Sequence, residues 1–290
     1  MPDADSTLAL AEHYLAVGRP ADALRVLDDA GGDAPSNPEY WLVRARASFG
    51  LRRWQEAAGA ARRGLAVDPE DVALLNMLAL SQLNGGLADI AEVTLGRALE
   101  LEPESPVLHA DLGLTLACLK RFPEARAEVE RALRLAPWSA HAQQVRAKVA
   151  VLADDPDADR VVDALLADDP EDDVAHALKG TIASRKKDFA AAARAFDEAA
   201  RLDPQDPANV GTARQARLVM HPLLAPLRPI WRYGWWTARV AVVAVWLALL
   251  AAGLHGVAEV VILLWLALIA YSYVAPRIVR RRARKRYGGF

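Results

Sequence analysis

Prolines recur at a nearly constant step through the first two thirds of the chain. They are separated by 34, 34, 34, 33 and 34 residues, at Pro35, Pro69, Pro103, Pro137, Pro170 and Pro204. Only 17 prolines occur among 290 residues, so the series carries more weight than a similar series of a common residue would. Proline ends a helix because it lacks a backbone N–H and clashes with the preceding turn. The step therefore predicts a repeated helical unit of about 34 residues.

Small residues keep the same step. Alanine stands twelve residues before each proline, at Ala23, Ala57, Ala91, Ala125, Ala158 and Ala192. Five residues before the proline stand Ala30, Gly64, Ala98, Ala132, Leu165 and Ala199. Further small residues open the units at Ala11, Ala45, Ala79, Gly113 and Gly180, and aromatic residues recur at Trp54, Phe122 and Phe189. Small residues allow close helix crossings, so the pattern indicates helices that pack closely.

This pattern resembles the tetratricopeptide repeat family in its period and residue types. The resemblance implies two antiparallel helices per unit and six stacked units over residues 4–206. Asn37-Pro38 and Ser105-Pro106 are typical of an N-cap followed by proline at the first helical position. The fifth unit, about 140–172, is degenerate: it is one residue short, has an acidic DDPDAD turn and lacks a small residue. Residues 206–220 are expected to form a capping helix with a polar outer face.

The apolar stretch of residues 240–275 is too long for one bilayer crossing. As one helix its 36 residues would measure about 54 Å, against a hydrocarbon core of about 30 Å. We therefore expect two spans, 235–253 and 256–275, joined by a tight turn at Leu254-His255-Gly256. The alternative is a pair of buried helices in a soluble domain. That would require a third apolar partner, and the repeats already bury their own apolar residues.

The net charge of the chain changes sign just before the predicted membrane spans. From residue 228 onward there are ten basic residues and one acid, Glu259, so 1–227 carry a net charge of −11 and the rest +9. The basic residues flank the two predicted spans, with a tail comprising Arg277, Arg280, Arg281, Arg282, Arg284, Lys285 and Arg286. Lys and Arg near span ends stay cytoplasmic. We expect a two-pass protein of a bacterial plasma membrane with its solenoid and C-terminus in the cytoplasm, which agrees with a single thiol, Cys118.

Two expectations concern the interior of the hairpin. Trp246 and Trp265 lie nine residues before and after the predicted turn, so we expect their rings to pack together. Trp235, Trp236, Tyr271 and Tyr273 are expected to form an aromatic belt at the cytoplasmic interface. Glu259 is either a functional carboxylate within the membrane or a side chain that reaches water at the far interface.

No pattern in the chain indicates catalysis. The six histidines have no metal-ligand spacing, and neither a phosphate-binding glycine loop nor a nucleophile elbow is present. Cys118 is expected to pack rather than react. We therefore predict that the protein is not an enzyme and has no catalytic, cofactor or metal site and no small-molecule substrate.

The resemblance places a binding groove on the first helices of the units. The groove residues would be Arg46, Phe49, Asn76, Met77, Leu80, Asp111, Leu114, Gln143 and Gln144. Their mixture of polar and apolar side chains suits a protein or peptide partner. Arg46 and Asn76 do not reproduce the Lys/Asn carboxylate clamp of some family members, so that specificity is not expected here.

The predicted architecture is all-α, a tetratricopeptide-type solenoid followed by a two-helix transmembrane hairpin. Its parts are a solenoid with a capping helix at 1–221, a Pro/Trp-rich juxtamembrane linker at 222–234, a hairpin at 235–276 and a basic cytoplasmic tail at 277–290. The predicted function is a membrane-anchored adaptor that recruits a protein partner, with anionic lipid headgroups bound by the tail. Two alternatives stay open: a structural subunit of a membrane complex, and, less favoured, nucleic-acid binding through the tail.

Overall fold

The computed structural model describes residues 4–29 and 36–287, with the side chains of residues 4, 5, 232, 280 and 282–287 left undescribed. Within this part the chain is helical and contains no strand. It divides into two compact units, Met1–Asp157 and Ala158–Phe290, and each is described by itself. The division falls between the two helices of the fifth repeat.

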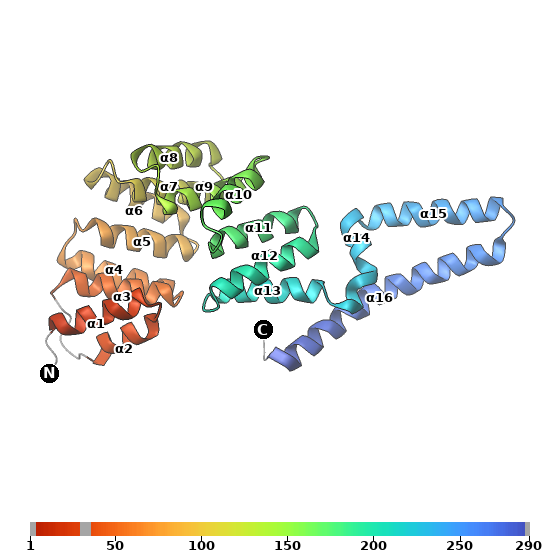
Figure 1. The fold of residues 1–290 in the computed structure, drawn as a ribbon, viewed down its shortest axis with the longest axis horizontal. Helices are drawn as coiled ribbons and strands as arrows, with labels where there is room; N and C mark the ends of the chain where they lie inside the picture. Colours follow the sequence, from red (N-terminus) through yellow and green to blue (C-terminus); the bar gives the residue numbers. More distant parts are fainter. Residues whose placement is uncertain (1–3, 30–35, 288–290) are drawn as a thin grey trace. The chain divides into compact units, whose positions relative to one another are not determined.

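The first unit is a stack of antiparallel helix pairs (Figure 1). Its helices are α1 (Ala4–Ala16), α2 (Pro20–Asp29), α3 (Pro38–Gly50), α4 (Trp54–Val67), α5 (Val72–Asn84), α6 (Ala88–Leu101), α7 (Pro106–Cys118), α8 (Phe122–Leu135) and α9 (Ala140–Leu152). The helices α1, α3, α5 and α7 each pack on the second helix of their own repeat, and α3, α5, α7 and α9 also contact one another in succession. The predicted helical solenoid is confirmed.

The second unit combines the end of the solenoid with a long helical hairpin (Figure 1). Its elements are α10 (Ala158–Asp168), α11 (Asp173–Arg185), α12 (Phe189–Leu202), α13 (Pro207–Val219), the 3₁₀ helix η1 (Pro222–Leu227), α14 (Arg228–Tyr233), α15 (Trp235–Ala251) and α16 (His255–Tyr287). The helices α11 and α12 form a pair, α13 packs on α12, and α15 runs alongside α16.

The prolines end the second helices as expected. The helices α4, α6, α8, α10 and α12 all stop two residues before the proline of their repeat; Pro35 and Ala30 lie outside the described residues. At the start of α3, Asn37 accepts a hydrogen bond from the Glu39 amide at 2.9 Å. The expected cap at Ser105 is only partly formed, because its side chain makes no capping hydrogen bond and its carbonyl instead accepts from the His109 amide.

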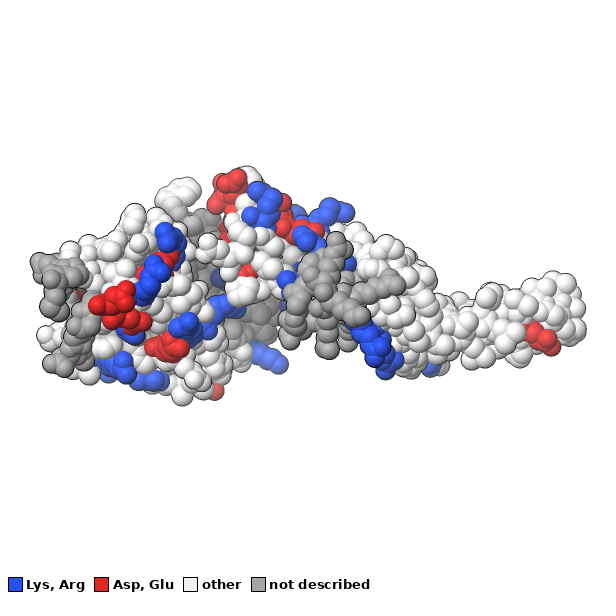
Figure 2. All heavy atoms as spheres, turned by 90° about the horizontal axis from the view of Figure 1, so that it is seen from below, with Lys and Arg blue, Asp and Glu red and all other residues white. Residues whose placement is uncertain are grey.

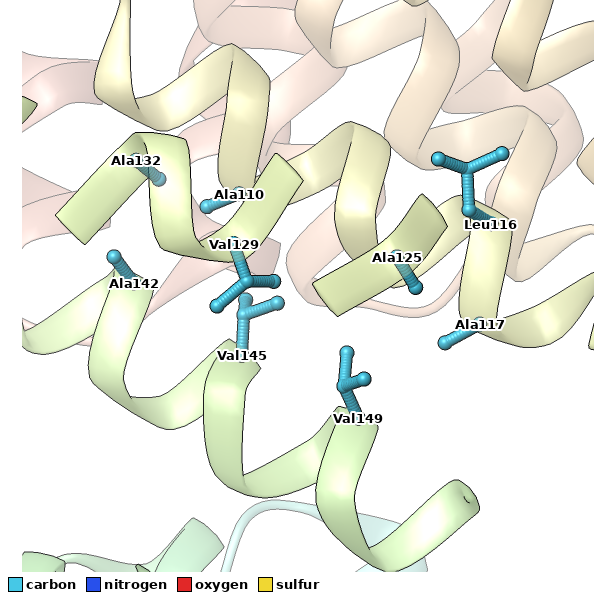
Figure 3. Close-up of a cluster of buried hydrophobic side chains, with 9 residues drawn as sticks. All are labelled: Ala110, Leu116, Ala117, Ala125, Val129, Ala132, Ala142, Val145 and Val149. Atoms are coloured by element: carbon cyan, nitrogen blue, oxygen red, sulfur yellow. The ribbon is translucent and has the colours of Figure 1, made fainter. Parts of the chain in front are cut away.

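Alanine and glycine provide the close contacts between helices. The alanines twelve residues before each proline are all buried. Figure 3 shows one resulting cluster, in which side chains of α7, α8 and α9 meet around Val129 and Val145. Gly113 lies so close to α8 that an added Cβ would stand 2.6 Å from Val129 Cγ2 and 3.0 Å from the Ala125 carbonyl oxygen. Ala147, fully buried in α9, is the small residue that seemed to be missing from the fifth unit.

The turn inside each repeat uses a left-handed residue. Positive φ angles occur at the same step in all six units, at Gly18, Arg52, Gly86, Lys120, Asp154 and Lys187. Each follows a first helix, and its amide bonds a carbonyl of the last turn, as in Lys120 N to Ala117 O at 3.0 Å. The sequence marks this position with glycine only twice, so its period was not visible beforehand.

The hairpin turn lies slightly earlier than predicted. It comprises residues 252–254, and Gly253 takes the left-handed conformation with φ of 76°. Its amide bonds Leu250 O and the next amide bonds Leu249 O, which closes the end of α15. His255 and Gly256, predicted within the turn, instead begin α16. Glycine is favoured at this conformation, and the sequence offered two candidates three residues apart.

The predicted pairing of Trp246 with Trp265 is wrong. Among the described residues, Trp265 packs edge-on against Trp235, with ring centroids 5.9 Å apart. Trp235 therefore belongs partly to the packed base of the hairpin. Tyr271 is also engaged there, since its hydroxyl donates to the Leu223 carbonyl. Trp236 is exposed, as expected for an interfacial belt.

The segment expected to be a linker is folded. Leu224, Leu227 and Ile230 are buried against Ala275 and Val279 of α16. The prolines are accommodated because they stand in the first turns of η1 and α14 and within the short 3₁₀ helix. The helix α16 also continues through Pro276, so the start of the basic tail extends the second hairpin helix.

Among the described residues, one helix is by itself long and apolar enough to cross a membrane. The His255–Val279 part of α16 has 25 residues and a mean hydropathy of 2.1, and only 6% of its apolar stretch is buried. The 17 residues of α15 measure about 26 Å, and this helix qualifies only together with Pro222–Trp231, from which it is bent by 86°. Figure 2 shows few charged residues on this face of the hairpin. Membrane insertion stays a prediction.

Candidate partner-binding surface

The nine predicted groove residues lie on four neighbouring first helices of the first unit. Arg46 and Phe49 are on α3, three residues are on α5, two are on α7, and Gln143 and Gln144 are on α9. Arg46 is exposed, Asp111 is buried, and the remaining seven are half-buried. The structure brings them onto successive helices but does not show a partner, so their role in binding stays a prediction.

A buried acidic side chain marks the middle of this set. Asp111 is 1% exposed, and its Oδ1 receives a hydrogen bond from His141 Nε2 of α9 at 2.8 Å. Its other oxygen, Oδ2, is buried without a hydrogen-bond partner among the described residues, and so is Oδ1 of Asn76 on α5. Unpaired buried acceptors are costly. These two atoms are therefore places where a water molecule or a partner's donor would be favoured.

Several predicted apolar anchors are already packed within the fold. Phe49 lies against the ring of Trp54, with centroids 4.8 Å apart. Met77 packs against the buried cluster around Trp41, and Leu114 packs against the cluster shown in Figure 3. Each can offer only part of its surface to a partner.

Gln143 has a structural partner that recurs along the chain. Its amide nitrogen donates to the Pro137 carbonyl at 3.2 Å, six residues earlier. In the neighbouring repeats His109 and His176 contact the carbonyls of Pro103 and Pro170 in the same way, both at 3.0 Å. The Arg97 guanidinium donates a hydrogen bond to the Pro69 carbonyl at 2.8 Å. The carbonyl of each of these helix-ending prolines is thus bound by a side chain, a regularity that the sequence analysis missed.

His109 is held from both sides. It is 3% exposed, and its Nδ1 lies 2.6 Å from Glu128 Oε2 while Nε2 faces the proline carbonyl. The Pro103 carbonyl can only accept, so in this arrangement Nε2 donates to it. This arrangement fits a structural contact between α7 and α8.

Ion pairs link the turns of adjacent repeats. Arg121 at the start of α8 binds Glu92 of α6 at 2.7 Å and Glu124 of its own helix at 2.8 Å. Hydrogen bonding to Arg121 lowers the pKa of Glu124.

Cys118 at the end of α7 is exposed, but its surroundings desolvate it in part, which raises the pKa of its thiol. A raised pKa disfavours the reactive thiolate at neutral pH.

A family comparison decides what these repeats are. The tetratricopeptide repeat model matches residues 8–72, 76–140 and 154–207, which together make up more than half of the chain. The chain is a tetratricopeptide repeat protein. The unmatched interval between the second and third matches coincides with α9 and the turn that follows it. The family model therefore covers the second helix of the degenerate fifth repeat, α10, but not its first helix.

Solved structures share the fold of this tetratricopeptide repeat protein at low identity. A chain of the APC/C hetero-tetramer Cut9–Hcn1 is 16% identical with a TM-score of 0.58, over 77% of this chain and 44% of that one. The type IV pilus biogenesis factor PilW is 20% identical with a TM-score of 0.55, over 73% and 96%. PilF of Pseudomonas aeruginosa is 20% identical with a TM-score of 0.50, over the same shares. This chain therefore spans less than half of the Cut9–Hcn1 relative, and no match was found among curated proteins.

Tetratricopeptide repeat proteins bind protein partners and are generally interaction scaffolds rather than enzymes. The fold is consistent with an adaptor or scaffold of this kind. Within the described residues, no group of three His, Cys, Asp or Glu side chains is arranged to hold a metal ion.

The predicted lipid-facing residues lie on the last part of α16. Arg277 and Arg281 are exposed there. The side chains of Arg280, Arg282, Arg284, Lys285 and Arg286 lie outside the described residues.

Near this helix the structure also contains a pocket that the sequence did not predict. Its volume is about 780 Å³, and it lies where α13, η1, α14, α15 and α16 meet.

Proposed function

We propose that this protein is a membrane-anchored tetratricopeptide adaptor. Its hairpin would hold the chain in the plasma membrane, and the first helices of its repeats would bind a protein partner at the cytoplasmic surface. Recruitment of this kind acts through effective concentration, because a tethered partner meets other membrane components at up to millimolar concentration.

The observation that carries the proposal is the exposure of an apolar hairpin. No residue of α15 is buried, although its sequence is almost wholly apolar. In α16, Leu263, Leu264 and Leu266 are each more than half exposed. A soluble protein rarely leaves so large an apolar patch uncovered. The alternative of two buried helices in a soluble domain lacks a covering partner in the described chain, which favours lipid as the surrounding medium.

Charge supports the proposed orientation. The exposed Arg277 and Arg281 follow the apolar part of α16, and Arg228 precedes α15. Both sites lie at the base of the hairpin, at the end opposite the turn. Positive residues beside span ends favour the cytoplasmic side. The solenoid leads into the same base through α13 and would therefore be cytoplasmic too.

Labelling of Cys118, the single cysteine of the chain, tests this topology. A membrane-impermeant maleimide, applied at pH 8 to spheroplasts, is expected to leave Cys118 unmodified and to modify it after permeabilisation. The matched variant carries Cys118→Ala and Leu254→Cys, which moves the thiol to the hairpin turn, where Leu254 is about half exposed. This variant should react in intact spheroplasts. Modification of Cys118 before permeabilisation would contradict the orientation.

Partner binding is tested on the full-length protein extracted in mild detergent. The double variant Arg46→Ala/Asn76→Ala should reduce at least one captured protein tenfold, measured by quantitative mass spectrometry. Arg131→Ala, an exposed change on the second helix α8, serves as the control and should retain that protein. An identical set of captured proteins for all three forms would count against the predicted groove.

A further inference from the structure

The pocket at the base of the hairpin is lined mainly by apolar and aromatic side chains and is partly open. Its lining includes Leu218 of α13, Leu224 of η1, Trp231 of α14, Trp235 of α15, and Tyr273 and Val279 of α16, together with the polar Gln215 and Ser272. Five elements therefore line it. A space of about 780 Å³ falls within the range of small-molecule sites.

A cation stands at the rim. Arg277 Nη1 donates to the carbonyl of Tyr273, one of the lining residues, at 2.7 Å. The guanidinium is exposed and keeps further N–H groups for a second acceptor. Arg281 follows one helical turn later and is also exposed. The only acid after residue 227 is Glu259, near the opposite end of the hairpin. The rim is thus suited to an anionic group such as a phosphate.

We propose that this base pocket holds an acyl chain of an anionic phospholipid, whose phosphate is bound by Arg277. The inference rests on the proposed membrane location, since the occupant comes from the bilayer. The apolar wall accounts for the chain, and the rim cation for the headgroup. Such a lipid would fill the space between the last solenoid helix and the hairpin.

Brominated lipids provide the test, because bromine quenches tryptophan fluorescence at short range and Trp231 and Trp235 line the pocket. Full-length protein is placed in phosphatidylcholine vesicles that contain 5 mol% dibrominated phosphatidylglycerol, or 5 mol% dibrominated phosphatidylcholine. We expect at least twofold greater quenching by the anionic lipid.

Three variants test whether the excess quenching by the anionic lipid arises in the base pocket. Arg277→Gln should reduce quenching by the anionic lipid to the phosphatidylcholine value. Ser272→Phe, which fills the pocket, should abolish the excess quenching. Leu263→Phe, on an exposed position of the same helix, should leave it unchanged. The exposed Arg277 change keeps the test informative if the filled pocket misfolds.

Two results would overturn the inference: equal quenching by both lipids in the wild-type protein, or excess quenching that persists in Arg277→Gln and Ser272→Phe. If lipid selectivity is absent and Ser272→Phe converts a dimer to a monomer on a native gel, the pocket accommodates a second copy instead. Vesicle flotation separates this failure from that of the proposed function. A protein that does not float contradicts the membrane anchor itself.

Discussion

Replacing Gly113 with leucine is expected to destabilise the solenoid by about 3 kcal/mol. An added Cβ would stand 2.6 Å from Val129 Cγ2 and 3.0 Å from the Ala125 backbone oxygen. A methyl group of valine can move slightly, but the backbone of α8 cannot move without separating from α7. Overpacking of this kind shifts backbones and forces side chains out of their preferred rotamers. The unfolding midpoint followed by circular dichroism at 222 nm should fall by about 6–12 °C.

Gly59 provides a control for the helix propensity of glycine. It lies within α4, and an added Cβ there would meet no atom within 4 Å. Gly59→Ala should therefore raise stability by up to about 1 kcal/mol, since alanine is the better helix former. Equal midpoints for Gly113→Leu and the wild type would show that α7 and α8 are not packed as described.

Two arginines placed in the middle of α16 are expected to remove the protein from the membrane. Leu263 and Leu264 are both 65% exposed. If they face lipid, each arginine costs about 3 kcal/mol of insertion free energy, so Leu263→Arg/Leu264→Arg costs about 6 kcal/mol. If they face water, exposed substitutions change stability by less than about 0.5 kcal/mol. Carbonate extraction and flotation should show most of the double variant in the soluble fraction or degraded.

Val93→Arg is the matched control. Val93 is 73% exposed on α6 of the solenoid, so the same side chain should leave both the folding and the membrane fraction unchanged. A double hairpin variant that resists carbonate as fully as the wild type would contradict insertion of α16.

The repeat architecture could be predicted because its constraints are local. In five repeats a proline stands two residues after the end of the second helix, and a buried alanine stands at the helix crossing of every repeat. The step of these residues thus predicted the paired helices and six repeats. The left-handed turn position escaped notice because four of its six residues, including Arg52 and Lys120, are not glycine.

The hairpin was harder to predict in detail. Periodicity predicts an apolar helix but not which of two glycines forms its turn. Counting residues from the turn also did not predict that Trp265 packs against Trp235, because that contact belongs to the packed base of the hairpin. The contacts of residues 222–234 depend on α16, and the Leu223–Tyr271 hydrogen bond joins residues 48 positions apart. Likewise, the orphaned oxygens of Asn76 and Asp111 arise from tertiary packing. The spacing of residues along the sequence does not predict contacts of this kind.

Trp231 of α14 packs against Phe189 at the start of α12, with ring centroids 6.3 Å apart, while α14 and α16 share the buried cluster around Leu227. The last repeat and the hairpin are therefore joined by packed side chains rather than by a flexible linker. If α16 spans a bilayer as proposed, a change in bilayer thickness that altered its inclination would also displace α12 of the terminal repeat.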